Sequence, residues 1–257
     1  MKLKFKEALK KSSIEKNSKI ILALDIPPEK PEKLFSKAIK IIRETQKHIC
    51  AVKFNRHLII PLDLKTINKL IEETAAFNLP TIMDCKIGDI GNTNKIIAEY
   101  YFKAGFNALT ANPIVGWSNA LDIVFETAKK FDGGILLLAY MSHSGAKEHF
   151  EALILNRETG TIKPQYLIFA EKAINWGADG VIVGATKPDK IKEIKALVED
   201  VLPIISPGVG VQGGRIEEAL AAGADYIIVG RSIVLAKNPS EAAEKLKHTI
   251  TNALKTL

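Results

Sequence analysis

The sequence contains little cysteine, and its two cysteines fit no metal-binding or disulfide pattern. Cys50 and Cys85 stand far apart and form no CxxC pair. This spacing excludes a disulfide-rich secreted scaffold and a zinc site built on paired thiolates.

Long apolar runs are also missing. The longest such stretch, near residues 133–141, is about half of the roughly 20 residues that a membrane-spanning helix needs. The lysine-rich N-terminus lacks the apolar segment and small-residue cleavage site of a secretory signal. We therefore expect a cytoplasmic protein without a membrane partner.

Acidic residues are in deficit, with 29 Asp and Glu against 36 Lys and Arg, so the net charge is +7. The lysines are scattered through predicted helices, as at Lys30, Lys33, Lys37 and Lys40, and form no basic run with interleaved aromatic residues. We therefore do not expect nucleic acid as a partner. A mildly basic enzyme that attracts an anionic substrate accounts for the charge.

One pattern repeats along all 257 residues: a short apolar run, a polar or glycine-containing turn, and a segment of helical periodicity. The predicted strands are residues 19–25, 50–54, 81–86, 108–111, 134–139, 180–183, 203–206 and 226–229. The predicted helices are residues 31–47, 63–77, 92–104, 117–130, 164–176, 187–199, 214–222 and 239–254. No Gly-, Pro- or Ser-rich linker divides them. The pattern predicts an α/β fold, a (β/α)8 TIM barrel forming one domain over residues 1–257, with an N-terminal helix near residues 3–11 covering the barrel bottom.

Active sites of such barrels lie at the C-terminal ends of the strands and on the loops that follow. Polar residues at or just after the predicted strand ends are therefore candidates for the site. They are Asp25, Lys53, Asp84, Lys86, Asn112, Ser142, Gln212 and Arg231.

The segment from Asp84 to Thr93 is the most informative. Side chains alternate in a strand, so Asp84 and Lys86 point into the barrel mouth while Cys85 faces the outer helices. Lys53 adds a second cation at the corresponding level of the adjacent strand, and Asp89 stands beside Lys86 or reaches a neighbouring subunit. An ordinary ion pair at a strand end is the simpler alternative. Alternating charges in a partly closed site instead favour catalysis, because buried charges persist only when they are paired.

A second group of residues suggests phosphate binding. Residues 206–214 form a Gly-rich loop after the seventh predicted strand, and Gly230-Arg231 follows the eighth. Barrels often bind phosphate between these two loops, where glycine lets backbone N–H groups approach the oxygens. The Arg231 guanidinium offers a permanent charge with bidentate geometry. The same glycines would suit a lid.

The sequence resembles the orotidine 5′-phosphate decarboxylase family. The matching motifs, in family order, are Leu24-Asp25, Val52-Lys53-Phe54, Asp84-x-Lys86-x-x-Asp89-Ile90-x-x-Thr93, Met141-Ser142-His143-Ser144-Gly145, Pro207-Gly208-x-x-x-Gln212-Gly213-Gly214 and Gly230-Arg231. It departs from the family at Gly91, where many members have Pro, and in the longer excursion over residues 146–163.

The resemblance implies a decarboxylation of orotidine 5′-phosphate to UMP that needs no cofactor or metal, in a homodimer with shared active sites. Asp84 would lie against the substrate carboxylate and Lys86 would protonate C6, with Lys53 and Asp89 completing the catalytic network. Asp25 and Lys53 would hold the ribose, and Asp89 and Thr93 would reach the other subunit's substrate. Ser142, a better match than Ser144, would contact the pyrimidine, Gln212 both pyrimidine and phosphate, and Arg231 the phosphate. The remaining matched substrate-binding positions are Ile90, Pro207 and Gly230.

Two alternatives stay open. A Mg²⁺-dependent sugar-phosphate decarboxylase or synthase of the same superfamily shares the Asp-x-Lys-x-x-Asp core, but Ile90, Thr93 and Gln212 favour the nucleotide. A non-catalytic barrel that binds a phosphate ligand would not need a buried proton donor such as Lys86. His143 and His149 lack the spacing and carboxylate partners of a metal site.

Overall fold

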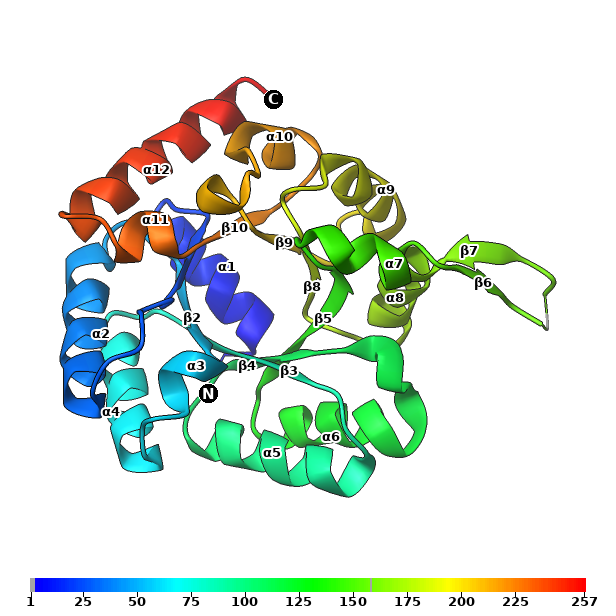
Figure 1. Cartoon of the computed structure of the whole chain (residues 1–257), viewed down its shortest axis with the longest axis horizontal. Helices are drawn as coiled ribbons and strands as arrows, with labels where there is room; N and C mark the ends of the chain where they lie inside the picture. Colours follow the sequence, from blue (N-terminus) through cyan, green and yellow to red (C-terminus); the bar gives the residue numbers. More distant parts are fainter. Residues whose placement is uncertain (1–2, 158) are drawn as a thin grey trace.

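The fold is a closed barrel of parallel strands, seen end-on in Figure 1. The computed structural model describes residues 3–157 and 159–257, so residues 1, 2 and 158 of the expected domain lie outside the described residues. Around the barrel the strands are β1 Ile20–Ala23, β2 Ala51–Asn55, β3 Thr81–Ile87, β4 Ala108–Ala111, β5 Gly134–Tyr140, β8 Gly180–Val183, β9 Ile204–Pro207 and β10 Tyr226–Val229. The last strand pairs with the first, which confirms the TIM barrel prediction.

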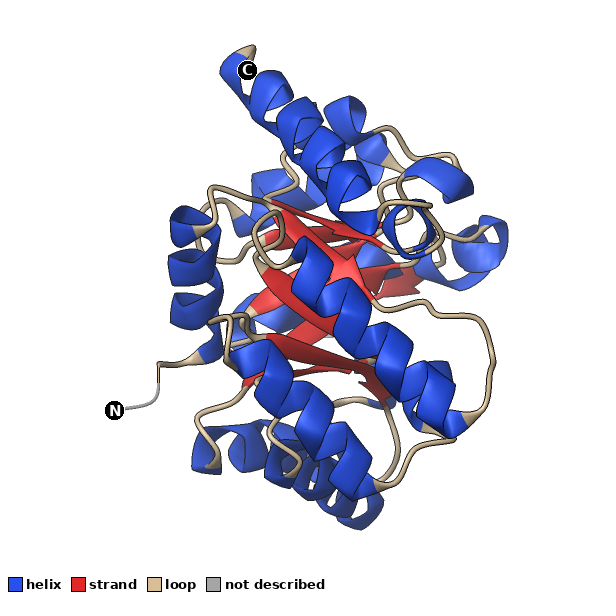
Figure 2. Ribbon diagram, turned by 90° about the vertical axis from the view of Figure 1, so that its left-hand side faces the viewer, coloured by secondary structure: helices blue, strands red, loops and turns tan. Residues whose placement is uncertain are grey.

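An outer layer of helices surrounds the strands (Figure 2). These helices are α2 Pro31–Thr45, α4 Leu64–Ala75, α5 Gly91–Lys103, α6 Asp122–Lys130, α8 Gln165–Asn175, α9 Pro188–Val198, α10 Ile216–Ala221 and α12 Pro239–Lys255. Each corresponds to a helix expected from the sequence. Their apolar faces and the outward side chains of the strands form the larger hydrophobic cluster, which includes Leu22, Val52 and Met83.

Helix α6 begins at Asp122, later than residue 117, where the periodicity predicted its start. Ser118 and Asn119 have non-helical backbone angles, and Asn119 has a φ of 55°. The Asp122 carboxylate accepts hydrogen bonds from the backbone N–H groups of Asn119 and Ala120, both at 3.0 Å. Asp122 thus satisfies free N–H groups at the helix start and fixes it there.

A second hydrophobic cluster fills the barrel interior with inward side chains such as Ile21, Ile82 and Ile228. Helix α1 (Phe5–Glu15) contributes Phe5 and Leu9 to this cluster. The Phe5 side chain lies against Gly134 at the beginning of β5, so α1 lies at the N-terminal ends of the strands. The polar candidate residues lie at the opposite end of the barrel, at the C-terminal ends of the strands.

Short elements lie between the strands and the outer helices. They are α3 Arg56–Ile59, η1 Pro113–Val115, η2 Trp117–Leu121, η3 Ser144–Ala146, α7 Lys147–Phe150, β6 Leu153–Leu155, β7 Ile162–Pro164, η4 Gly210–Gln212 and α11 Arg231–Val234. Strands β6 and β7 pair antiparallel, and Figure 1 shows this hairpin extending beyond the ring of helices. The expected excursion over residues 146–163 is therefore a short helix followed by a β-hairpin. Across the described part of the chain, no helix has the length and apolarity to cross a bilayer.

Candidate active site

A cavity of about 370 Å³ opens at the C-terminal ends of the strands. Most of the residues that the sequence singled out line it: Asp25, Lys53, Asp84, Lys86, Ser142, Pro207, Gln212, Gly230 and Arg231. They come from six different strands or the loops directly after them, and the barrel topology brings them together.

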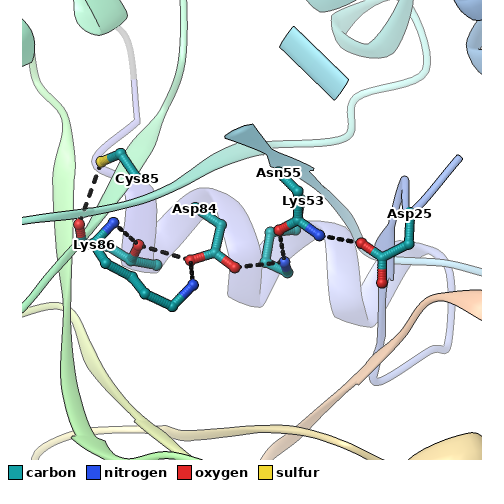
Figure 3. Close-up of polar contacts among 7 residues, drawn as sticks. Asp25, Lys53, Asn55, Asp84, Cys85 and Lys86 are labelled. Atoms are coloured by element: carbon teal, nitrogen blue, oxygen red, sulfur yellow. Dashed lines mark hydrogen bonds and ion pairs between the residues drawn. The ribbon is translucent and has the colours of Figure 1, made fainter. Parts of the chain in front are cut away.

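A chain of polar contacts crosses one wall of the cavity (Figure 3). Asp84 accepts from Lys86 Nζ through Oδ1 and from Lys53 Nζ through Oδ2, each at 2.7 Å. Lys53 Nζ also donates to Asn55 Oδ1, and Asn55 Nδ2 donates to Asp25 Oδ1. The charges along this wall alternate from Lys86 at one end to Asp25 at the other, and the neutral Asn55 amide separates Lys53 from Asp25.

The two ammonium groups determine the protonation of Asp84. Burial raises the pKa of this carboxyl, but the charges of Lys53 and Lys86 lower it more, so the pKa lies far below its usual range. Asp84 is therefore ionised throughout the pH range in which the protein is expected to work.

A bulge in β3 sets the position of Lys86. The register between β3 and β4 shifts between Met83 and Ile87, and Lys86 adopts a left-handed backbone with φ 46°. Its backbone N–H donates to Thr110 Oγ1 at 2.8 Å, and the same hydroxyl donates to Asp84 Oδ1 at 3.0 Å. Thr110 of β4 thereby fixes both the main chain of Lys86 and the carboxylate beside its ammonium. Cys85 faces the opposite side and belongs to the outer cluster.

The sequence predicted that Lys53 lies at the same height in the barrel as Asp84, and the pairing of β2 with β3 shows that this is wrong. Asn55 is the residue opposite Asp84, whereas Lys53 pairs with Ile82, closer to the barrel interior. The long lysine side chain spans the difference and still reaches Asp84. Because the Lys53 backbone lies two residues deeper in the barrel than Asn55, Lys53 is only 5% exposed.

The loops after β5 and β9 meet over the cavity. Ser142 Oγ donates to Gln212 Oε1 at 2.8 Å. Gly208 has a φ of 99°, and a Cβ atom there would lie 2.9 Å from the Ser142 Cβ, so the close approach of the loops requires glycine. At Gly230 a Cβ atom would likewise collide with the Asp25 carboxylate.

Much of the Gly-rich loop is hydrogen-bonded to itself. The N–H groups of Gly210, Gly213 and Gly214 donate to Gly214, Gly210 and Gly208 carbonyls at 3.0, 2.7 and 3.1 Å. In this conformation an anion at the loop would depend on other donors. Arg231, exposed at the start of α11, and Ser232 both line the cavity beside the loop.

Four sequence-predicted residues do not line this cavity: Asp89, Ile90, Thr93 and Asn112. The Asn112 side chain instead accepts a hydrogen bond from the Ile114 N–H at 3.2 Å, at the start of η1. Asp89 and Ile90 are exposed in the turn after β3, and Thr93 lies in the first turn of α5. Asn94 holds this turn, because its side chain accepts from the Asp89 N–H at 2.9 Å and donates to the Ala120 carbonyl at 3.0 Å.

Sequence reasoning overlooked several cavity residues, namely Asn55, Arg56, His57, Thr110, Tyr140 and Ser232. The alternation of side chains along a strand could have identified Asn55 and Thr110. Asn55 lies on the same face of β2 as Lys53, and Thr110 points inward because its two neighbours in β4 point outward. Arg56 and His57 follow β2 in α3, a short helix that the apolar periodicity did not indicate.

The described residues provide neither a reactive thiol nor a cluster of metal ligands. Burial raises the pKa of both thiols, Cys50 and Cys85, to about 12, so neither is a nucleophile at neutral pH. No cluster of three or more His, Cys, Asp or Glu side chains within residues 3–157 and 159–257 has the arrangement of a metal site.

Comparison with known proteins matches this chain to one family over most of its length. The family profile described as "Orotidine 5'-phosphate decarboxylase / HUMPS family" matches residues 18–246. The chain belongs to this family.

Individual members of the orotidine 5′-phosphate decarboxylase family support this assignment. The chain is 37% identical over 242 residues to the orotidine 5′-phosphate decarboxylase of Methanosarcina mazei, covering 94% of this chain and 99% of the relative. It is 38% identical over 227 residues to that of Pyrococcus abyssi, covering 88% and 96%. The crystal structure of orotidine 5′-monophosphate decarboxylase from Methanocaldococcus jannaschii complexed with inhibitor BMP superposes with a TM-score of 0.76 at 30% identity, covering 91% and 98%.

Proposed function

We propose that this protein decarboxylates orotidine 5′-phosphate to UMP. The observation that carries the proposal is the Lys86–Asp84–Lys53 array on the wall of a cavity at the C-terminal ends of the strands. Relatives that align over nearly their whole length bear the name of this activity. We propose a cytoplasmic location on the sequence alone.

The reaction breaks the bond between C6 and the carboxylate, and the electron pair stays on C6 as carbon dioxide leaves. This carbanion has little resonance stabilisation, so positioned charge must stabilise it. The Lys86 ammonium supplies that charge and then transfers its proton to C6, after which water returns a proton to Lys86. The ionised Asp84 lies beside the substrate carboxylate, and its repulsion is relieved when carbon dioxide departs.

Binding energy from the rest of the nucleotide holds C6 against Lys86. In the proposed complex Arg231 binds the phosphate and Gln212 contacts both phosphate and pyrimidine. Ser142 contacts the pyrimidine edge, and Asp25 and Lys53 bind the ribose hydroxyls. Pro207 and Gly230 shape the cavity around them.

We further propose a homodimer in which Asp89, Ile90 and Thr93 complete the partner's active site. Asp89 is proposed to join the partner's catalytic network. Large apolar side chains are exposed around this segment: Ile90 is 68% exposed, Ile96 47%, Tyr100 57% and Ile114 58%. A monomer rarely leaves such a group in water, so a second copy of the chain is the proposed cover.

The direct test is the loss of absorbance when orotidine 5′-phosphate is mixed with the protein in EDTA. The proposal expects complete conversion to UMP without added metal. Turnover of a sugar phosphate only with Mg²⁺, and none of the nucleotide in EDTA, would replace it with the sugar-phosphate alternative.

A further inference from the structure

The last residue of β5, Tyr140, borders the cavity but directs its side chain away from it. The register between β5 and β8 shifts between Leu138 and Tyr140. Leu138 belongs to the inner cluster, whereas Ala139 and Tyr140 both belong to the outer one. The irregularity thus places a fully buried phenol behind the wall of the site, two residues before Ser142.

The excursion after β5 docks on this phenol. Tyr140 Oη donates to Glu151 Oε1 at 2.6 Å, and Glu151 directly follows α7. The neighbouring Phe150 ring lies 5.5 Å from the Tyr140 ring and 6.0 Å from Phe169 of α8. Glu151 is therefore a polar connection between the excursion with its β6–β7 hairpin and the strand end that leads to Ser142.

Other contacts hold the same strand end from the opposite side. The Gly184 N–H donates to the Tyr140 carbonyl at 2.9 Å, and Thr186 Oγ1 donates to the Ser142 carbonyl at 2.9 Å. A Cβ atom at Gly184 would lie 2.6 Å from the Ser142 Cα, so the segment has no free space toward β8. Tyr140 to Ser142 is thus fixed between β8 and the excursion.

We propose that Glu151 is a positioning residue for substrate binding: through Tyr140 it holds Ser142 at the place from which Ser142 contacts the pyrimidine and Gln212. This inference rests on the proposed function, because that function assigns Ser142 to the substrate. The excursion then tunes affinity for the nucleotide, and the reacting groups on β2 and β3 are untouched by it.

The test compares Tyr140→Phe, Glu151→Ala and their double variant with the wild type. Phe keeps the ring packing and loses only the hydroxyl. Each single variant should raise KM for orotidine 5′-phosphate and Kd for UMP about tenfold with kcat within about twofold, because the lost contact acts on binding and not on the chemical step. The double variant should be no worse than either single one. Glu151→Gln keeps an acceptor for the phenol and should stay within about twofold of wild type.

Tyr166→Phe is the matched control. Tyr166 is buried beside Tyr140 and its hydroxyl donates to the carboxylate of Glu193, but it belongs to α8 and does not lead into the loop. This variant should leave KM and UMP affinity unchanged. Unchanged KM and Kd in Tyr140→Phe and Glu151→Ala, or an equal rise in Tyr166→Phe, would overturn the inference. A wild-type protein inactive on the nucleotide would instead remove the proposed function.

Discussion

Lys53 is a buried ammonium that the fold supports with two oxygen acceptors. Its side chain is 7% exposed, and it contacts Asp84 Oδ2 and Asn55 Oδ1. A charge removed from water is costly unless such partners replace the solvent. The free site is thus held in its charged form before substrate arrives, and Asp84 is the group on which this depends.

Asp84→Asn should lower the free energy of unfolding by roughly 3 kcal/mol at pH 7, because it leaves Lys53 buried without its counter-ion. The folded pKa of Asp84 lies below the unfolded value of about 4. Its stabilisation is therefore complete above pH 4 and is lost as pH falls below that value. Denaturant titrations between pH 3 and 8 should show a difference in unfolding free energy between wild type and variant. This difference should be constant well above pH 4 and should shrink as the pH falls below that value.

Asp189→Asn is the control for this measurement. Asp189 pairs with Lys190 at 3.4 Å while its side chain is 61% exposed, so its loss should cost less than about 0.5 kcal/mol. A more stable Asp84→Asn variant would mean that the charged array is strained in the free protein, contrary to our account.

The apolar pattern of the sequence is sufficient to locate the strands and outer helices of the barrel. Each expected strand lies within two residues of an observed one, as with 81–86 against β3 Thr81–Ile87. The β6–β7 hairpin was not predicted because each of its strands has only three residues, although Asn156 and Gly160 between them are typical turn residues. Leu153, Leu155 and Ile162 are exposed in it, which runs against the burial on which periodicity arguments rest.

The candidate site was predictable where a polar residue lies near the C-terminal end of a strand, as with Asp25, Asp84 and Ser142. It was not predictable where the exact register decides. The bulge that turns Lys86 into a left-handed conformation depends on pairing with β4, and the sequence of β3 carries no sign of it.

The loops after β9 and β10 are proposed to bind the phosphate, and Arg231 is their charged residue. Arg231→Ala should lower kcat/KM for orotidine 5′-phosphate at least about 100-fold, equal to about 2.7 kcal/mol, through loss of a charge-assisted contact. Orotidine, which lacks the phosphate, never uses the contact and should show a much smaller relative loss. Equal losses for both substrates would make Arg231 a structural residue.

In the proposed homodimer, each chain contributes residues to two active sites. Asp89 and Thr93 lie outside the cavity of their own chain, next to exposed Ile90 and Ile96. A site that takes Lys86 from one subunit and Asp89 from the other can be restored by mixing defective copies.

Mixing inactive Lys86→Ala with inactive Asp89→Ala subunits should therefore restore activity to about half of the sites in each heterodimer, because one of the two sites is then wholly intact. Sedimentation before and after exchange reports the oligomeric state. A monomeric protein, or exchange without rescue, would refute the shared site.

Lys86 is proposed to deliver the proton to C6, and measuring both turnover and UMP binding in Lys86→Ala tests this role. We expect kcat on orotidine 5′-phosphate to fall more than about 1000-fold, about 4 kcal/mol of barrier, while Kd for UMP stays within about tenfold of wild type. Such a split places Lys86 in the transition state and not in ground-state binding. A variant that keeps kcat within about tenfold of wild type would show that Lys86 is not the proton donor.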